Sequence, residues 1–381
     1  MECAFAGSSK ALNVFVSYCA LLVEGGRQKG KGDYVLALRW HGRRDVRLEE
    51  VDGPPPPGPG EVQLRILWCG ICGTDVEEYK NGPIFIPTER PHPLTGRSAP
   101  LTLGHEFCGE VVAVGPGVDR YEHGDRVAAD TLIFCGECYW CKRHQVVLCQ
   151  KLAALGLMAD GGLAELCNAP AYTCRAVPNG MSSESAALAE TLAVAVRALR
   201  RGRLRTGERV AVVGAGAVGL MALQAAGAGG ASTVSVVEPL PGRRRLASAL
   251  GAGETYAPEE APEIQADLVV ECSGGAQAIQ TAIRAARKGG RVVLVGIYGH
   301  PSEIDFLQVV AAEKEIIGSL SHVYDEDFDA SLALLGRGAV RAEPLVSDRI
   351  PLDRALDDGI LALMREPQEH LKILISPNGG G

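Results

Sequence analysis

Two patterns of apolar and polar residues divide the chain near residue 182. Before that point, short segments alternate apolar with polar positions, as half-buried strands do. The predicted strands are a hairpin over residues 35–48 and single segments at 61–67, 107–114 and 126–129. A proline-rich connector at 54–59 and a long ordered loop at 81–100 separate some of these strands. We therefore expect the first part of the chain to be rich in β-structure.

After residue 182, continuous apolar strands alternate with helices. The predicted strands cover residues 209–213, 233–237, 268–271 and 291–296. The predicted helices cover residues 183–201, a run that ends at 228, and residues 242–250 and 276–286, with Ser182 or Ser183 as the first N-cap. This alternation indicates a parallel sheet covered by helices on both faces. Beyond about residue 321 the pattern is mixed, and we expect a final strand at 371–375 to rejoin the first domain.

Length and charge limit the classes of function. A chain of 381 residues suggests two domains, and its net charge of -8 without a long basic run excludes nucleic acid as the main partner. No apolar run approaches the ~20 residues that span a bilayer, and no convincing secretory signal is present, so we expect no membrane partner and a cytoplasmic location. Residues 1–33 match no pattern and are interpreted as an N-terminal extension, non-native or produced by a mis-called start.

Four of the twelve cysteines lie close together, at Cys135, Cys138, Cys141 and Cys149. Four thiolates at this spacing can close a tetrahedral zinc site with no open position, which is typical of structural zinc in a reducing compartment. The alternative is that four unrelated cysteines share one loop. Five scattered cysteines are interpreted as small buried hydrophobes: Cys69, Cys108, Cys167, Cys174 and Cys272.

A second candidate metal site lies between residues 68 and 110. Cys72, His105 and Glu106 supply a thiolate, an imidazole and a carboxylate, the three ligand types that zinc accepts. His105 and Glu106 are adjacent, so in a regular strand their side chains would point to opposite faces. They can serve one metal only if the backbone kinks, or if one moves in when the other leaves. The pattern favours an open, adaptable site over a closed structural one.

A glycine-rich turn follows the predicted strand at 209–213 and opens a helix, with the sequence Gly214, Ala215, Gly216, Ala217, Val218, Gly219. Such a turn lets backbone N–H groups at a helix N-terminus approach a pyrophosphate. Glu238 ends the next strand, where a carboxylate can bind both ribose hydroxyls and disfavour a 2′-phosphate. NAD is therefore favoured over NADP, although Arg243 and its two neighbours weaken this preference. The alternative is a turn that serves only helix–strand packing.

Two further residues are ambiguous from the residues alone. Glu190 is a carboxylate inside an apolar helical segment and needs a partner, either a helix-end contact or a metal. Thr74, two residues after Cys72, is either a turn hydroxyl or a proton donor to a group bound at the metal.

With these motifs, the chain resembles the zinc-containing medium-chain dehydrogenase/reductase family over residues 36–377. The segments W-C-G-I-C-G-T-D, G-P-I-F-I-P and L-G-H-E-F-x-G-E-V-V are most similar to those of 2,3-butanediol (acetoin) dehydrogenases. The resemblance implies an α/β protein with two domains. A GroES-like β-rich catalytic domain would span residues 34–190 and 323–381, and a Rossmann NAD-binding domain with a doubly wound parallel sheet would span 191–322.

The resemblance also implies roles for particular residues. The catalytic zinc ligands would be Cys72, His105, Glu106 and Glu190, with Glu106 alternating with solvent or standing behind the metal. Thr74 would pass on the proton of the alcohol, and the four clustered cysteines would hold a structural zinc. Two positions depart from the family: Glu77 replaces the usual relay histidine, which could reroute the relay through His92, and Thr191 replaces a proline. Segment 254–266 is also short, so one crossover of the Rossmann domain is expected to be trimmed.

The expected reaction is the reversible oxidation of a secondary alcohol, (R,R)-2,3-butanediol to acetoin, with hydride transfer to NAD and zinc as Lewis acid. The partner is a small alcohol or diol, and family habit implies a homodimer or homotetramer. Another polyol, threonine or an aminocyclitol remains an alternative substrate. A protein that binds zinc and nucleotide but has lost turnover is the alternative of another class, and Glu77 is its only support.

Overall fold

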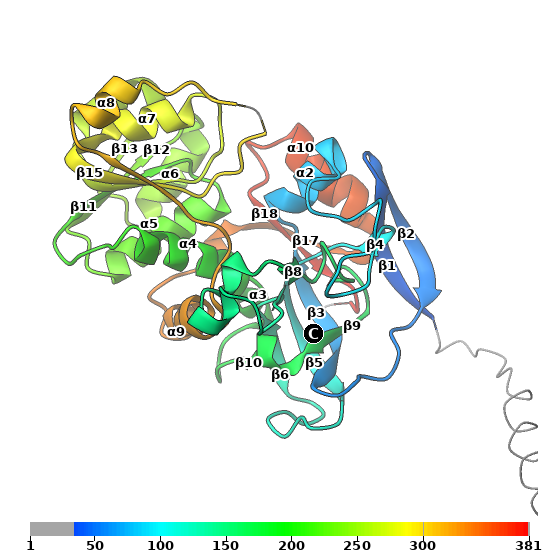
Figure 1. Cartoon of the computed structure of the whole chain (residues 1–381). Helices are drawn as coiled ribbons and strands as arrows, with labels where there is room; N and C mark the ends of the chain where they lie inside the picture. The colour runs from blue at the N-terminus through cyan, green and yellow to red at the C-terminus, as the bar shows by residue number, and fades with distance from the viewer. Residues whose placement is uncertain (1–33, 300, 380–381) are drawn as a thin grey trace, which may run out of the picture.

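The computed structural model describes residues 34–299 and 301–379, so the interpretation of residues 1–33 lies outside the described part. The chain forms two parts that lie side by side, with the parallel sheet and its helices in one and most of the antiparallel strands in the other (Figure 1). In the described part of the chain, no helix is long and apolar enough to cross a membrane.

The first part is built on a seven-stranded sheet in the order β10-β6-β5-β3-β18-β17, with β9 also paired to β3. Its strands are β3 (Glu61–Gly70), β5 (Glu106–Val114), β6 (Arg126–Ala129), β9 (Leu166–Pro170), β10 (Cys174–Ala176), β17 (Val346–Pro351) and β18 (Lys372–Ser376). A smaller sheet has the order β2-β1-β4, and a two-stranded sheet joins β7 to β8. These strands are β1 (Tyr34–Gly42), β2 (Asp45–Asp52), β4 (Leu101–Thr102), β7 (Leu132–Ile133) and β8 (Ala153–Ala154).

Strand β3 lies at the centre of this sheet because its apolar side chains alternate. Val62, Leu64 and Ile66 are fully buried in one core, while the intervening residues are partly exposed. The strand pairs with β5, β9 and β18, so it holds together segments that are far apart in the sequence. The C-terminal β18 pairs antiparallel with β3 through Leu374 opposite Gly70, which is where the tail rejoins the first part of the chain.

The second part is a six-stranded, all-parallel sheet in the order β13-β12-β11-β14-β15-β16. Its strands are β11 (Arg209–Val213), β12 (Thr233–Val237), β13 (Glu254–Tyr256), β14 (Ala266–Glu271), β15 (Ala286–Leu294) and β16 (Glu315–Gly318). Val210 and Val212 face the core shared with α4 and α5, whereas Ala211 and Val213 face the core shared with α7. Figure 1 shows helices on both sides of this sheet, so the doubly covered parallel sheet is confirmed.

The described residues form nine α-helices. They are α2 (Gly73–Asn81), α3 (Ser183–Ala187), α4 (Ala189–Arg201), α5 (Ala217–Ala228), α6 (Pro241–Ala249), α7 (Ala278–Ala285), α8 (Phe306–Val310), α9 (Asp329–Gly336) and α10 (Leu361–Arg365). Of these, α3 to α7 fall where the pattern predicts helices, whereas α2, α8, α9 and α10 were not predicted. Ser182 caps α3 by accepting a hydrogen bond from the Ser185 amide at 3.1 Å. The single helix predicted over 183–201 is wrong in one respect, because it breaks into α3 and α4 at Leu188.

Eight short strands of the described chain escaped prediction: β4, β7, β8, β9, β10, β13, β16 and β17. Each is only two to six residues long, and β13 and β16 form the two edges of the parallel sheet, where alternation is weak. Between β13 and β14 the structure has a single 3₁₀ segment, Pro258–Glu263, in place of a longer helix. This agrees with the short crossover expected from the sequence.

We expect Leu64→Ala to lower the free energy of unfolding by about 3 kcal/mol, because it removes a fully buried side chain from the central strand. Leu36→Ala, in the half-exposed face of β1, is the matched control and should change it by less than ~1 kcal/mol. Urea unfolding followed by circular dichroism measures both values. Equal losses would contradict the central place of β3 in the core.

Candidate active site

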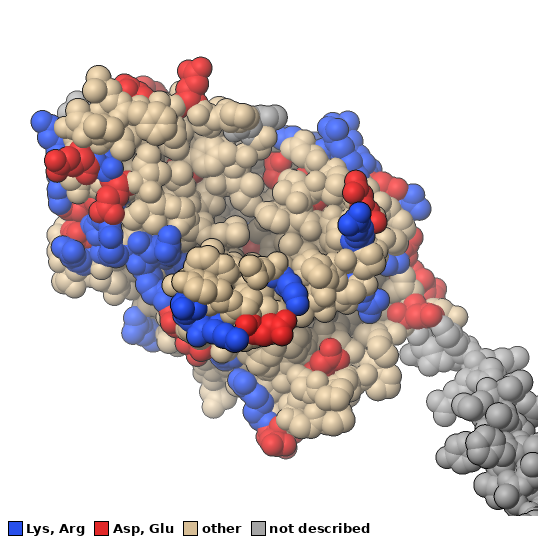
Figure 2. Space-filling view, viewed as in Figure 1, with Lys and Arg blue, Asp and Glu red and all other residues tan. Residues whose placement is uncertain are grey.

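A cavity of about 520 Å³ lies between the two parts of the molecule. Its wall combines Cys72, Thr74 and His105 of the first part with Gly216 and Val218 of the second. In the space-filling view the surface between the two parts is hollowed and carries few charged side chains (Figure 2). One cavity therefore collects residues of both predicted sites.

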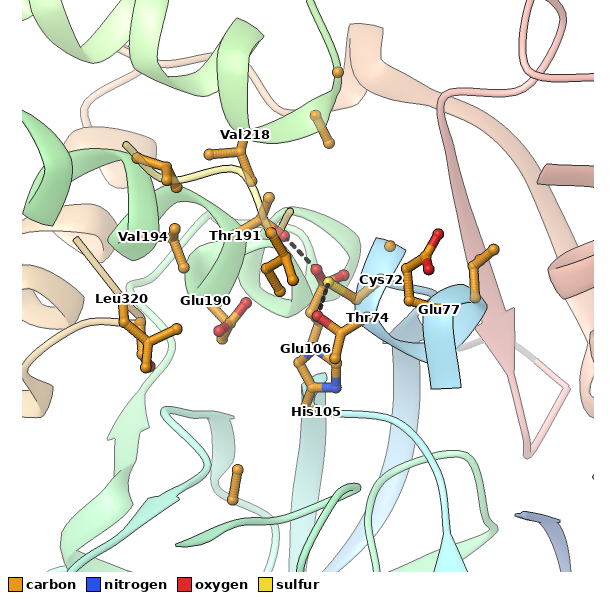
Figure 3. Close-up of a pocket in the computed structure, with 18 of the residues that line it drawn as sticks. Cys72, Thr74, Glu77, His105, Glu106, Glu190, Thr191, Val194, Val218 and Leu320 are labelled. Atoms are coloured by element: carbon orange, nitrogen blue, oxygen red, sulfur yellow. Dashed lines mark hydrogen bonds between the residues drawn. The ribbon is translucent and has the colours of Figure 1, made fainter. Parts of the chain in front are cut away.

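Cys72 is presented by the junction between β3 and α2. It is the N-cap of α2, and its backbone N–H donates to the Asp75 carboxylate at 2.9 Å, which fixes the start of the helix. The Cys72 thiol donates to the Thr74 hydroxyl oxygen at 3.7 Å. The sulfur and the hydroxyl therefore sit together on the cavity wall, as Figure 3 shows.

A glycine in a left-handed conformation, Gly104 with φ +92, directly precedes the adjacent pair His105 and Glu106, and a Cβ there would lie 2.7 Å from the Cys69 sulfur. Donor atoms of Cys72, His105 and Glu106 lie within 4.8 Å of one another. Sulfur, nitrogen and oxygen donors at this spacing fit zinc, so the adjacent pair can serve one metal.

Asp75 stands behind His105 in a fully buried position. Its Oδ1 lies 3.6 Å from His105 Nδ1, and neither atom has a hydrogen-bond partner within normal distance. With Nδ1 turned toward the carboxylate, Nε2 is the ring nitrogen available to a metal. A carboxylate behind a ligating histidine orients the ring and increases its basicity.

Glu106 is fully buried and is held by two side chains. Lys372 Nζ donates to its Oε1 and Oε2 at 2.8 and 2.6 Å, and the Thr191 hydroxyl donates to Oε1 at 2.9 Å (Figure 3). Burial raises the pKa of Glu106, but the Lys372 ammonium and His105 outweigh it and leave the pKa below its usual value. Burial lowers the pKa of Lys372, but Glu106 and Cys72 outweigh it and leave the pKa raised. Both directions describe an ionised pair.

Glu190 lines the same cavity but lies outside the group of converging donor atoms. Its Oε1 lies 3.5 Å from Nδ1 of His322, which is fully buried and whose Nε2 lies 2.9 Å from Asp130 Oδ2. Burial raises the pKa of Glu190, and His322 opposes this effect. Burial lowers the pKa of His322, but Asp130 and Glu190 outweigh it and raise the pKa to about 9. The structure thus pairs each of the two cavity carboxylates with its own cation.

The four clustered cysteines form a compact lobe after β7. Their sulfur atoms all lie within 4.8 Å, with pairs at 3.5 Å for Cys138–Cys141 and Cys135–Cys149. Zinc bound by four thiolates at about 2.3 Å gives sulfur–sulfur separations of about 3.8 Å, so this lobe fits a closed zinc site. His144, also in the lobe, places its Nε2 2.9 Å from Asp325 Oδ1 and so ties the lobe to the segment before α9.

The glycine-rich turn leads from β11 into α5. A Cβ at Gly219 would lie 1.9 Å from the Gly214 carbonyl oxygen, so only glycine permits this close packing. At Gly216 a Cβ would meet nothing within 4 Å, so the turn faces open space. Ala217 and Val218 also line the cavity. The turn therefore fits the approach of a pyrophosphate to the first amides of α5.

Glu238 and Arg243 flank this turn. The Glu238 carboxylate accepts hydrogen bonds from the Ala215 amide at 2.7 Å and the Leu240 amide at 2.9 Å, which fixes it beside the glycine-rich turn. Arg243 lines the cavity, and its guanidinium donates to the Pro367 carbonyl at 2.5 Å. Arg243 therefore links the second part of the molecule to the C-terminal segment of the first.

Two family models match the chain: the alcohol dehydrogenase GroES-like domain over residues 58–179 and the zinc-binding dehydrogenase over residues 217–337. The (R,R)-butanediol dehydrogenase of Bacillus subtilis (strain 168) is 36% identical over 355 residues, which cover 90% of this chain and 99% of that protein. The chain belongs to the zinc-containing medium-chain dehydrogenase/reductase family. It is therefore a zinc-dependent alcohol or polyol dehydrogenase, and its cofactors are zinc and a nicotinamide dinucleotide.

Solved structures and a second relative place this dehydrogenase within a broad family. The crystal structure of 2R,3R-butanediol dehydrogenase from Bacillus subtilis has a TM-score of 0.83 at 36% identity, covering 90% of this chain and all of that one. A zinc-binding dehydrogenase from Sinorhizobium meliloti 1021, bound to NADP, has a TM-score of 0.81 at 30% identity, covering 90% and 99%. The L-threonine 3-dehydrogenase of Pyrococcus furiosus is 35% identical over 316 residues, covering 80% and 88%.

The proton relay of this dehydrogenase departs from the histidine that the resemblance leads one to expect. Glu77 lines the cavity, but its carboxylate accepts from the Asn81 amide at 2.7 Å and points away from the Cys72 sulfur (Figure 3). His92 does not line the cavity, and its Nδ1 faces the Leu94 amide at 3.3 Å. The geometry therefore gives His92 no direct place in a relay.

Sequence reasoning missed three residues of this site: Asp75, His322 and Lys372. Asp75 had a local signal, because a carboxylate three residues after an N-cap commonly reaches back to the N-cap amide. His322 and Lys372 had none, because their carboxylate partners lie far away in the sequence. Cys272, interpreted as a small buried hydrophobe, packs against the core but is only half-buried and also lines the cavity.

We expect the purified dehydrogenase to hold two zinc ions per chain. Cys72→Ala should lose one with little change in thermal stability, and Cys138→Ser should lose the other and lower Tm by roughly 5–10 °C, because the lobe folds around its metal. Mass spectrometry of the native protein and calorimetry measure these values. Two zinc ions retained in Cys138→Ser would contradict the structural site.

We expect the stabilising effect of His322 to depend on pH. Its folded pKa of about 9 lies above the ~6.5 of an unfolded histidine, so its contribution is complete below pH ~6.5 and is lost as the pH rises through 9. The difference in unfolding free energy between the native protein and His322→Gln should therefore be largest at pH 6 and shrink by about 3 kcal/mol at pH 10. The exposed His123→Gln is the control. A difference that stays constant with pH would refute this.

Proposed function

We propose that this dehydrogenase reversibly oxidises a secondary alcohol, the vicinal diol (R,R)-2,3-butanediol, to the ketone acetoin. The carbinol carbon gives a hydride to NAD, and the hydroxyl proton leaves to solvent, so the products are acetoin, NADH and a proton. The observation that carries the proposal is the single cavity whose wall holds both the Cys72–His105–Glu106 group and the glycine-rich turn. The 36% identity to a butanediol dehydrogenase supports the choice of diol.

Each residue of the proposed active site has a defined role in this reaction. Cys72, His105 and a carboxylate would hold the zinc, which supplies Lewis-acid stabilisation of negative charge on the substrate oxygen when bound. Thr74 lies on the cavity wall beside the Cys72 sulfur, where its hydroxyl can accept the alcohol proton and pass it on. Glu77 lines the same cavity, three residues after Thr74 on α2, so in this proposal it takes the place of the histidine as acceptor.

Glu238 supports NAD over NADP in this proposal. Its buried carboxylate is fixed beside the glycine-rich turn by two backbone amides, and a negative charge there disfavours a 2′-phosphate. Arg244, which would otherwise attract a phosphate, donates to the Glu238 and Pro239 carbonyls and is thereby engaged.

The cavity wall favours a short uncharged diol over threonine or an aminocyclitol. Away from the metal-binding group, the wall is largely apolar and includes Leu132, Leu157, Val194, Ile297 and Leu320. Threonine would place an ammonium and a carboxylate against such a wall, and unpaired buried charges are costly. Other polyols remain the alternative, because single contacts in such pockets discriminate by only about 1–3 kcal/mol.

We propose that the enzyme assembles as a homodimer or homotetramer and works in the reducing cytoplasm. Phe306, Leu307 and Val310 are exposed apolar residues on α8, which directly precedes the edge strand β16 of the parallel sheet in the chain. A second copy that covers these residues would remove them from water. The ten cysteines in the described part of the chain are all free thiols, which suits a reducing compartment.

The decisive experiment measures initial rates of NADH formation with (R,R)-2,3-butanediol and of NADH consumption with acetoin. Sorbitol, threonine and a cyclitol are run in parallel, and NADP replaces NAD in a second series. We expect the highest kcat/KM with butanediol and acetoin, a preference for NAD, and a loss of at least about 1000-fold in Cys72→Ala, because removal of one metal ligand abolishes the charge stabilisation.

Thr74→Ser, which keeps the hydroxyl, is the conservative control for Thr74→Val, which should lose about 100-fold in kcat. Turnover only on another polyol would keep the mechanism and refute the diol. NAD binding and two zinc ions without turnover on any alcohol would instead favour the catalytically silent protein, and Glu77→His would then be the variant to test.

A further inference from the structure

The Glu106 carboxylate is unusual in the cavity because donors from two different elements hold it. Lys372, the first residue of β18, contacts both of its oxygens, and Thr191, in the first turn of α4, contacts Oε1. Oε1 therefore accepts two hydrogen bonds and Oε2 accepts one. Lys372 Nζ is itself fixed by the Ile71 carbonyl at 3.1 Å, so the ammonium cannot follow the carboxylate if it turns.

Space for this arrangement comes from Gly70 on β3. A Cβ at that position would lie 2.3 Å from Glu106 Oε2, so any larger residue would push the carboxylate out of its place. Gly70 therefore leaves space for the carboxylate, whose oxygen atoms lie near the donor atoms of Cys72 and His105. The arrangement lets Glu106 reach a metal while donors from the protein compete for the same oxygens.

The hydrogen bond from Thr191 to Glu106 can be removed by a substitution that leaves the charge of the site unchanged. The Thr191 side chain is 1% exposed, and its hydroxyl donates to Glu106 across a separation of 85 residues. Thr191 directly follows Glu190, the other carboxylate of the cavity. Lys372 contacts both oxygens through one nitrogen atom, about which the carboxylate can turn, whereas the Thr191 hydroxyl donates to Oε1 from a second direction.

We propose that Thr191 is a positioning residue that holds the Glu106 carboxylate away from the metal, so that Glu106 serves as a reserve ligand and not as a permanent one. The Lys372 ammonium neutralises Glu106 and weakens its attraction to a cation, and the Thr191 hydroxyl prevents the carboxylate from turning toward Cys72 and His105. The inference rests on the metal site of the proposed function and adds the residue that controls its ligand set.

The proposal predicts how the protein behaves when the hydroxyl is lost. Without it, Glu106 pivots about Lys372 and binds the metal more often, so the metal is released more slowly and turnover falls. A hydroxyl that only satisfied a buried acceptor would affect stability and leave the release of metal unchanged. The rate of metal release therefore separates the two roles.

The test uses the full chain with cobalt in the catalytic site, because cobalt absorbs visible light in a way that reports its ligands. Thr191→Val removes the hydroxyl at nearly constant volume, and Thr191→Ser retains it. Thr191→Pro is a second hydroxyl-free variant, since proline is tolerated in the first turn of a helix. Thr173→Val, which removes a fully buried hydroxyl that donates to the Pro170 carbonyl, is the control for stability alone.

We expect a chelator to remove cobalt about fivefold more slowly from Thr191→Val and Thr191→Pro than from the native protein, the factor that a net hydrogen bond of ~1 kcal/mol represents. Their visible spectra should shift, and kcat should fall while KM changes little. Thr191→Ser and Thr173→Val should match the native protein in spectrum and release rate.

An unchanged release rate and spectrum in both hydroxyl-free variants would overturn the proposal, as would faster release, which would mean that Thr191 holds Glu106 on the metal. Failure of the metal site itself is distinguishable, because Cys72→Ala would then keep the cobalt spectrum of the native protein. If Thr191→Val does not fold, Thr191→Pro decides the outcome.

Discussion

The pairing of β18 with β3 brings together residues from the two ends of the described chain, and the geometry of the active site depends on it. Strand β3 ends at Gly70, just before Cys72, and β18 begins at Lys372, whose ammonium reaches Glu106 on the neighbouring β5. Breaking this pairing would take the Lys372 ammonium away from Glu106, although the pairing of β3 with β5 would still hold Cys72 close to Glu106. The C-terminal strand is therefore part of the catalytic centre, although none of its residues was singled out by the motifs.

Charge balance explains how so many ionisable groups share a buried cavity. Glu106 has Lys372 as its cation, and Glu190 has His322, which Asp130 also contacts. An unpaired buried charge is costly, and each of the two carboxylates has a cationic side chain beside it that offsets this cost. The protein therefore balances the charge of this cavity largely with its own side chains.

The sequence predicts features that are formed by residues close together in the chain, and it does not predict contacts between residues that are far apart. Strand β11, the glycine-rich turn and the cysteine lobe were predicted because each is defined by residues that are close in the chain. The break at Leu188 and the edge strands were missed because tertiary packing decides them. Lys372 lies 266 residues from Glu106, and His322 lies 192 residues from Asp130, so a single sequence gives no indication of either contact.

The contact between His144 and Asp325 gives the cysteine lobe influence over a site that it does not touch. Asp325 lies three residues after His322, in the segment that returns from the parallel sheet to α9. The lobe thus contacts the backbone segment that carries His322, the partner of Glu190. A substitution that moved His144 would therefore disturb the backbone that carries His322, and so reach the surroundings of Glu190 without altering any residue of the cavity wall.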